Sequence, residues 1–208
     1  MTRKKTWLCL GAALLILAGT AAGGYFWYRD RQSQPVTVTA DQAQELPAES
    51  VVYFRQKDDR WRADALGDSR YHMADSGCLV CCVASALQMQ HLSVEGLPAD
   101  ADAGQVNEFF SAHGVYDSEG NLQWEVLEQV TGLTAEECDA AALDECLQNG
   151  DDPIVLVKMP KSGSFHFVLL MGSADGEYQC MDPLQPEEQT VPLSYFGSRI
   201  YGMRVLHA

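Results

Sequence analysis

Positive charge is scarce beyond the first 31 residues of this chain. Residues 32–208 hold 9 of the 14 lysines and arginines but 28 of the 29 acidic residues, which gives them a net charge of −19. An electric field of this sign repels nucleic acids and other anionic polymers. We therefore exclude a nucleic-acid-binding role and interpret most of the acidity as a solvated surface.

The sequence also lacks internal repeats and a clear spacing of metal ligands. Cys138 and Cys146 are eight residues apart in what reads as one helix. That separation is two helical turns rather than one, which is poor ligand spacing and disfavours a zinc site. The six cysteines beyond Cys9 do not reveal a disulfide pairing. No metal ion or cofactor is expected.

One long uncharged run lies at the N-terminus, from Thr6 to Tyr28. Its 23 residues are enough to cross a hydrocarbon core of about 30 Å at about 1.5 Å per residue. The basic cluster before it, Arg3 to Lys5, predicts that the N-terminus stays inside and the rest of the chain lies outside the cytoplasm. Residues 1–31 are thus predicted to be a cytoplasmic tip and a single transmembrane signal-anchor.

A cleaved signal peptide ending near Thr20 to Ala22 is the alternative, and it would make the protein secreted. The aromatic cluster from Tyr25 to Tyr28 suits the membrane interface and favours retention. Residues 32–50 are rich in Gln, Ala, Thr and Glu and contain two prolines, so they are interpreted as a linker. Residues 51–208, about 160 residues, suit one domain.

Helical patterns dominate the first part of this domain. A short strand signal at 51–54 and an ordered loop at 55–75 come first. A helix from Cys78 to about His91 follows, with Gly77 before it. Further helices are predicted over residues 104–113, 122–130 and 134–149. The last of these begins with Thr134 and has Glu137 three residues on, the pattern of a capping box.

The second part of the domain reads as strands. The apolar runs 153–159 and 166–171 are joined by Pro160 to Ser164, which is a hairpin signal, and further strands are expected at 177–181 and 199–206. Helices followed by antiparallel strands predict an α+β domain. Cys78 then belongs to the helical half and His166 to the sheet half, so a site containing both would lie in the cleft between them.

Three residue types in this order are the parts of a thiol acyl-transfer site. Cys78 stands directly after Gly77 at a helix start, where the dipole and the free N–H groups of the first turn favour a thiolate. His166 is placed to take up the proton. Asp182 is placed to orient the imidazole ring. The pattern predicts nucleophilic catalysis through a thioester.

Three segments together resemble the C39-like peptidase family, a papain-like group of cysteine peptidases. The segments are Val52–Trp61, which holds Gln56-x-Asp-x-x-Trp; Tyr71–Cys78 with its helix; and His166–Gly172 with Asp182-Pro183 on the next strand. The resemblance extends over residues 51–206. It implies a papain-like fold with Cys78 as nucleophile, His166 as base, Asp182 as the orienting residue and Gln56 as an oxyanion-hole donor.

The expected function is therefore a membrane-anchored extracytoplasmic cysteine peptidase or related amide-bond hydrolase, with peptide or protein substrates near the outer membrane face. A catalytically silent papain-like binding module is an alternative from another class. Cys78-Leu-Val-Cys81 is also formally the Cys-x-x-Cys of a thiol–disulfide oxidoreductase, although no strand signal immediately precedes it. Each residue also has an ordinary interpretation: Cys78 as core, Asp182 as a turn residue and Gln56 as a surface side chain.

Overall fold

The computed structural model describes residues 35–40 and 51–208. Their helices are α2 (Met73–Ser76), α3 (Cys78–Met89), α4 (Ala103–Ala112), α5 (Trp124–Thr131) and α6 (Leu143–Asn149), with 3₁₀ turns at Ala140–Ala142 and Leu193–Phe196. Their strands are β1 (Val36–Thr37), β2 (Thr134–Glu137), β3 (Ile154–Lys158), β4 (Phe165–Ala174), β5 (Glu177–Met181), β6 (Val191–Pro192), β7 (Arg199–Ile200) and β8 (Gly202–His207). This mixture of helices and strands confirms the predicted α+β class.

The principal sheet of the described residues is antiparallel, with the strand order β2-β8-β3-β4-β5-β6. The predicted hairpin is confirmed as β3 and β4, in which Val157 pairs with His166 and Lys158 with Phe165. The short strands β1 and β7 form a separate antiparallel pair. The sheet thus places the start of β4, and His166 with it, beside the hairpin loop.

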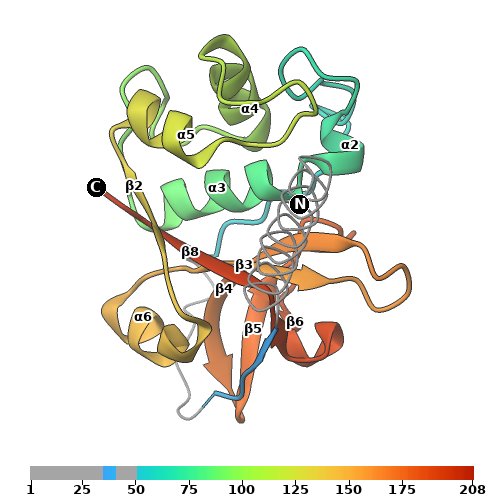
Figure 1. Cartoon of the computed structure of the whole chain (residues 1–208), viewed down its shortest axis with the longest axis vertical. Helices are drawn as coiled ribbons and strands as arrows, with labels where there is room; N and C mark the ends of the chain where they lie inside the picture. Colours follow the sequence, from blue (N-terminus) through green and yellow to red (C-terminus); the bar gives the residue numbers. More distant parts are fainter. Residues whose placement is uncertain (1–34, 41–50) are drawn as a thin grey trace, which may run out of the picture. The chain divides into compact units, whose positions relative to one another are not determined.

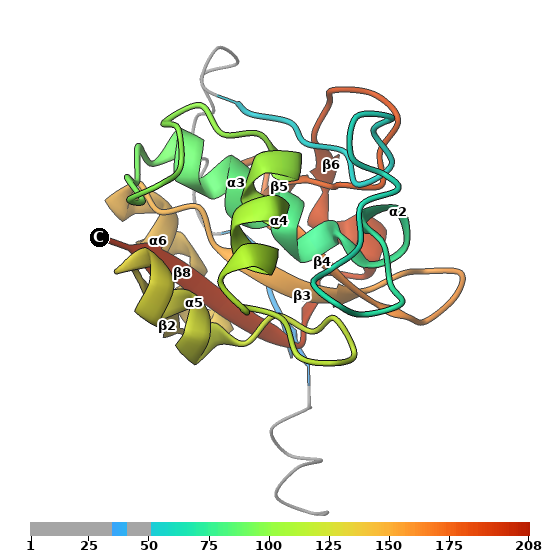
Figure 2. The same ribbon diagram turned by 90° about the horizontal axis from the view of Figure 1, so that it is seen from above.

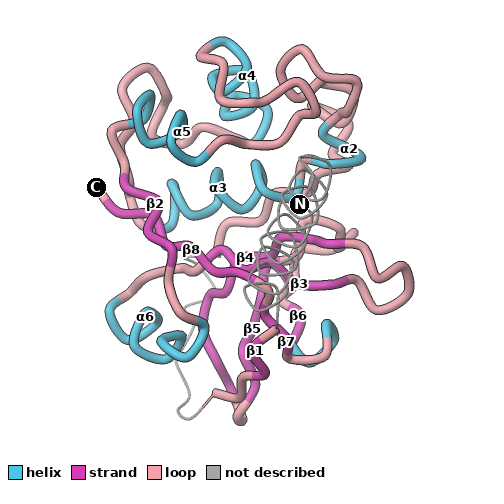
Figure 3. The backbone as a smooth tube through the Cα atoms, viewed as in Figure 1, coloured by secondary structure: helices cyan, strands magenta, loops and turns pink. Residues whose placement is uncertain are grey.

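Helix α3 lies between the sheet and the helices α4 and α5 (Figure 1). Figure 2 shows the same helix from above, passing beneath α4, and Figure 3 shows α2 to α5 gathered in one part of the molecule and the strands in the other. Side chains of β4 alternate between two cores, as a strand requires. Leu169 and Met171 pack in the core that contains α3, whereas Val168 and Leu170 pack in the core that contains α6.

The apolar run that follows Cys78 explains the position of α3. Its residues from Leu79 to Leu87 are all buried, so this helix has no solvated face along most of its length. A helix that is apolar all round is a core helix. The prediction of a helix over this segment, with Cys81 and Cys82 in the core, is confirmed.

Two predicted elements differ in the structure. Residues 134–137 form strand β2 rather than the first turn of a helix, and helix α6 begins only at Leu143. The β8 edge outcompetes the capping box here, because Thr134 pairs with His207 and the Arg204 guanidinium donates to the Ala135 carbonyl at 2.7 Å. The strand predicted at 51–54 is also wrong. Those residues join no sheet, and Phe54 instead packs edge-to-face on Trp61.

Part of the predicted linker belongs to the domain. Val36 pairs with Ile200, the Val38 N–H donates to the Ser198 carbonyl at 3.0 Å, and Ala40 is buried. The domain therefore begins at residue 35. None of the helices within 35–40 and 51–208 combines the length and the apolar character needed to cross a bilayer. The transmembrane segment predicted for residues 6–28 lies outside the described residues.

Candidate active site

Cys78 is the first residue of α3, and only Gly77 separates this helix from α2. A Cβ atom at Gly77 would lie 2.6 Å from the Met73 carbonyl oxygen and 2.8 Å from the Met73 sulfur, so no larger residue fits without a shift. Glycine therefore allows α2 and α3 to meet closely, with Cys78 as the first residue of α3. The free N–H groups of the first turn stabilise negative charge there. Cys78 remains partly exposed, whereas the next two cysteines are fully buried.

His166 is the second residue of β4 and is 3% exposed. Its Nε2 atom lies 2.7 Å from the Oδ1 atom of Asp182. The side chain of Cys78 lies close enough to the ring to raise the pKa of the imidazole. Because Nε2 is engaged by Asp182, the Nδ1 atom is the one that remains for Cys78. The three predicted residues therefore lie close together in the structure.

Asp182 follows the last residue of β5 and is 4% exposed. Besides the ring of His166, its Oδ1 atom accepts the Leu184 backbone N–H at 2.8 Å, and the Gln185 amide approaches its Oδ2 atom at 3.4 Å. The sequence suggested either a turn residue or an orienting residue, and the carboxylate has the contacts of both. Gln185 escaped sequence analysis; its only signal is its position three residues after the aspartate.

Electrostatics favour a protonated His166. Burial lowers the pKa of this imidazole, but the hydrogen bond to Asp182 and the contact with Cys78 outweigh it and raise the pKa from 6.5 to about 9. An imidazolium therefore persists at neutral pH. Between a carboxylate and a thiol, it is the form that can stabilise a thiolate and later donate a proton.

The raised pKa of His166 predicts a pH dependence of stability. A folded-state pKa above the unfolded value of 6.5 means that the native state holds the proton more tightly. This stabilisation is complete below pH 6.5 and is lost as the pH rises through about 9. We expect urea unfolding to show a loss on the order of 2 kcal/mol across this window. Asp182→Asn should shrink that loss, and an unchanged pH slope in this variant would contradict the assignment.

Gln56 is 3% exposed and belongs to the loop before α2. Its Nε2 atom donates to the Ala74 carbonyl at 2.9 Å, and its backbone N–H donates to the Pro183 carbonyl at 3.0 Å. A primary amide carries two hydrogens, so one remains after the bond to Ala74. Gln56 lines the same cleft as Cys78 and His166. The alternative interpretation of Gln56 as a surface side chain does not hold, because the residue is buried.

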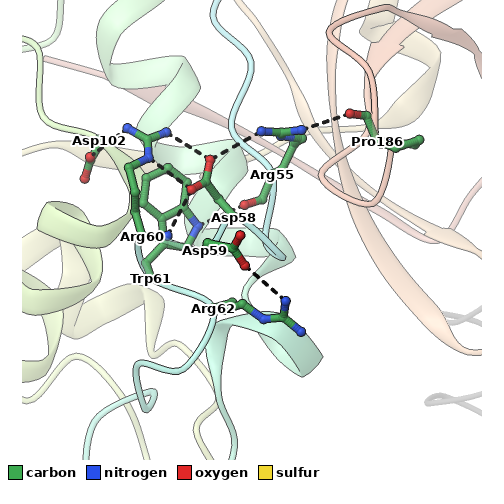
Figure 4. Close-up of polar contacts among 8 residues, drawn as sticks. All are labelled: Arg55, Asp58, Asp59, Arg60, Trp61, Arg62, Asp102 and Pro186. Atoms are coloured by element: carbon green, nitrogen blue, oxygen red, sulfur yellow. Dashed lines mark hydrogen bonds and ion pairs between the residues drawn. The ribbon is translucent and has the colours of Figure 1, made fainter.

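A polar network fixes the loop that carries Gln56 (Figure 4). Arg55 donates to the Pro186 carbonyl at 2.9 Å, which ties this loop to the segment after Asp182, and the Trp61 indole N–H donates to the Arg55 carbonyl at 2.9 Å. Two hydrogen bonds of 3.0 Å from the Arg60 guanidinium to Asp58 hold the pKa of that carboxyl near 2. These hydrogen bonds therefore hold the loop, and with it the backbone of Gln56, in a fixed position.

A cleft of about 840 Å³ opens beside these residues, between the helical half and the sheet half. Its volume is in the range of small-molecule and peptide sites. Cys78, His166 and Gln56 all line it. The helical side adds the apolar side chains Leu66, Tyr71, Leu79 and Trp124, and the sheet side adds Met159, Phe165 and Phe167. The cleft therefore offers an apolar lining next to the thiol.

The other chemistries weighed for these cysteines find little support in the contacts. Cys81 is fully buried, and burial raises the pKa of its thiol well above the usual value. An incoming disulfide has no access to such a sulfur, which disfavours a Cys78–Cys81 exchange pair. Within the described residues, no group of three or more His, Cys, Asp or Glu side chains is arranged to hold a metal ion.

Comparison of the sequence with protein-family profiles and with curated proteins finds no match. Among solved structures, a match is described as a candidate C39-like peptidase from Bacillus anthracis. It is 14% identical, and the match covers 81% of this chain and 98% of that chain, with a TM-score of 0.49. A likeness at this level leaves the activity to be inferred from the site itself.

Proposed function

We propose that this chain is a papain-like cysteine peptidase or a related amide-bond hydrolase that acts through Cys78, His166 and Asp182. The observation that supports it most is the chain of contacts from the Asp182 carboxylate through the His166 ring to the Cys78 thiol, at the wall of an 840 Å³ cleft. A nucleophile, a base and a group that orients the base are the minimum set for this chemistry.

In the first step, the Cys78 sulfur attacks the carbonyl carbon of an amide bound in the cleft. His166 holds the thiol proton as imidazolium and passes it to the leaving amine, so that the C–N bond breaks and a thioester remains on Cys78. The 2.7 Å contact with Asp182 keeps Nδ1 of the ring directed at the sulfur. Water then attacks the thioester carbonyl carbon while His166 accepts its proton. The C–S bond breaks, the acid is released, and Cys78 returns as a thiolate beside the imidazolium.

Negative charge develops on the carbonyl oxygen in both steps. The backbone N–H of Cys78, at the start of α3, and the amide hydrogen of Gln56 not used by Ala74 are the donors that serve this oxygen. Gln56 is held from both sides, through its side chain and its backbone. A donor fixed before the reaction costs little reorganisation when the charge appears.

We further propose that residues 1–31 anchor this domain to the outer face of the membrane. Because the domain begins at residue 35, only six residues separate it from Tyr28, and they extend at most about 20 Å. The substrates would then be peptide chains close to the bilayer.

Protease added to intact cells without an outer barrier should remove the domain. Digestion only after lysis would contradict this placement.

The catalytic proposal is tested with a mixture of defined unmodified peptides that together present every amino acid at each position. Wild-type protein should generate new N-termini in a subset of them, as mapped by mass spectrometry, and Cys78→Ala should generate none. If both proteins bind the same peptides and cleave none of them, the domain is a catalytically silent binding module instead. Cleavage that persists at the wild-type rate in Cys78→Ala would exclude this thiol as the nucleophile.

A further inference from the structure

Two thiols outside the cleft pack in the same core, beside the edge strand β2. Cys138 directly follows β2, and its backbone N–H donates to the Met203 carbonyl of β8 at 3.1 Å. Cys146 lies in α6 and is 8% exposed, within the core on the α6 side of the sheet. The Cys138 side chain packs against the buried cluster that contains Cys146, and its thiol donates to the Glu136 carbonyl at 3.6 Å. Each of the two thiols also contributes to the pKa shift of the other.

The turn between the two cysteines explains their shared packing. In one continuous helix, two residues eight positions apart would lie about 12 Å apart along the axis. The chain instead leaves β2 and turns at Asp139, whose Oδ1 atom accepts the Ala141 N–H at 2.9 Å, before α6 begins. The strand that replaces the predicted helical turn is therefore what places both thiols in one core.

We propose that Cys138 and Cys146 form an intramolecular disulfide in the native protein, with a low-molecular-weight or protein disulfide as the oxidant. One thiol loses its proton and its sulfur attacks the oxidant, which releases one thiol and leaves a mixed disulfide. The sulfur of the second cysteine then attacks the mixed disulfide and releases the other thiol. Two electrons and two protons pass to the oxidant, and one S–S bond links the end of β2 to α6.

This bond would be structural rather than easily exchanged. Burial raises the pKa of Cys146 to about 11 and also raises that of Cys138, and the carboxylate of Asp151 adds to both shifts. Thiols of high pKa are poor leaving groups, so their disulfide resists attack. The backbone on both sides is already held, by β8 and by α6. Closing the short loop 139–145 should raise the folding equilibrium constant on the order of 10²-fold.

The remaining described cysteines do not compete for this pairing. Cys81, Cys82 and Cys180 are fully buried in the interior. Cys78 is the thiol that contacts His166. The pair therefore leaves the proposed nucleophile reduced, and the disulfide does not depend on the proposed function.

The test is a map of disulfides in the full-length protein after incubation with oxidised glutathione. The protein is unfolded in acid, its free thiols are alkylated, and it is cleaved at acidic residues. Because Asp139, Asp144 and Glu145 lie between the two cysteines, cleavage there separates them unless a disulfide joins them. We expect the Cys138 and Cys146 peptides to be linked to each other. Recovery of both as alkylated or glutathione-bearing peptides, or a link to any other cysteine, would overturn the proposal.

A stability measurement supplies the second readout. Urea unfolding of the oxidised and reduced wild-type protein should differ by the expected factor on the order of 10² in the equilibrium constant. The double variant Cys138→Ser and Cys146→Ser should unfold identically with and without reductant. A reductant effect of full size in the double variant would assign the cross-link to other cysteines.

Discussion

Replacing His166 with alanine is expected to lower amide hydrolysis by about 10⁴-fold or more, the cost of losing the base from a nucleophile–base pair. Alkylation of Cys78 should fall in parallel, because the ring no longer takes up the thiol proton. The ring is buried and contacts both Asp182 and Cys78, so its removal breaks both links at once. The measurement is the initial rate on a peptide that the wild-type protein cleaves, alongside iodoacetamide labelling at pH 7.

His207→Ala is the matched control for this variant. His207 is partly exposed at the end of β8 and lies near carboxylates, including Glu136 at 3.5 Å, but it does not line the cleft. Its loss should leave turnover within about twofold of wild type, as expected for a surface substitution. Equal losses in the two variants would show that histidine replacement acts through general destabilisation, and the assignment of His166 as base would fail.

Gln56→Ala should lower catalytic turnover while leaving the alkylation of Cys78 almost unchanged. Loss of one oxyanion-hole donor slows catalysis by about 10²–10³-fold. The thiol, by contrast, keeps its contact with the His166 ring, so Cys78 should still be alkylated at close to the wild-type rate. If the variant lost alkylation and turnover together, Gln56 would maintain the structure of the site rather than stabilise the developing oxyanion.

Gln88→Ala controls for the loss of an amide hydrogen bond at a partly buried position. The Gln88 Nε2 atom also donates to a backbone carbonyl, that of Ala101 at 3.0 Å, but Gln88 does not line the cleft. Each substitution removes one such hydrogen bond, so the two variants should lose comparable stability, about 1 kcal/mol. Only Gln56→Ala should lose turnover beyond what its unfolding midpoint explains.

The elements predicted correctly are those whose signal is local and strong. The unbroken apolar run after Cys78 suffices for a core helix, and two apolar runs around a Gly-containing turn suffice for the β3–β4 hairpin. Residues 134–137 were predicted as the start of a helix, whereas they form strand β2, whose partner is distant in the sequence. Thr134 pairs with His207, so a local capping pattern was opposed by contacts far along the chain.

The same division holds for the candidate site. The position of Cys78 at a helix start can be read from neighbouring residues, and its meeting with His166 follows from the order of helices and strands. The position of Gln56 cannot be read from neighbouring residues. Its loop is held by contacts such as that of Arg55 with Pro186, which is 131 positions away. The docking of residues 35–40 on β7 was likewise invisible, because a two-residue strand carries almost no pattern.

The most direct test of the central claim is competitive alkylation of the native protein at pH 7. A limiting amount of iodoacetamide is added, the reaction is quenched, and the label on each cysteine is quantified by peptide mass spectrometry. The account predicts that Cys78 is modified at least tenfold faster than any other cysteine, because it lies at a helix start and contacts the His166 imidazolium. Labelling of Cys78 no faster than Cys138, or only after unfolding, would contradict the claim that Cys78 is a nucleophile.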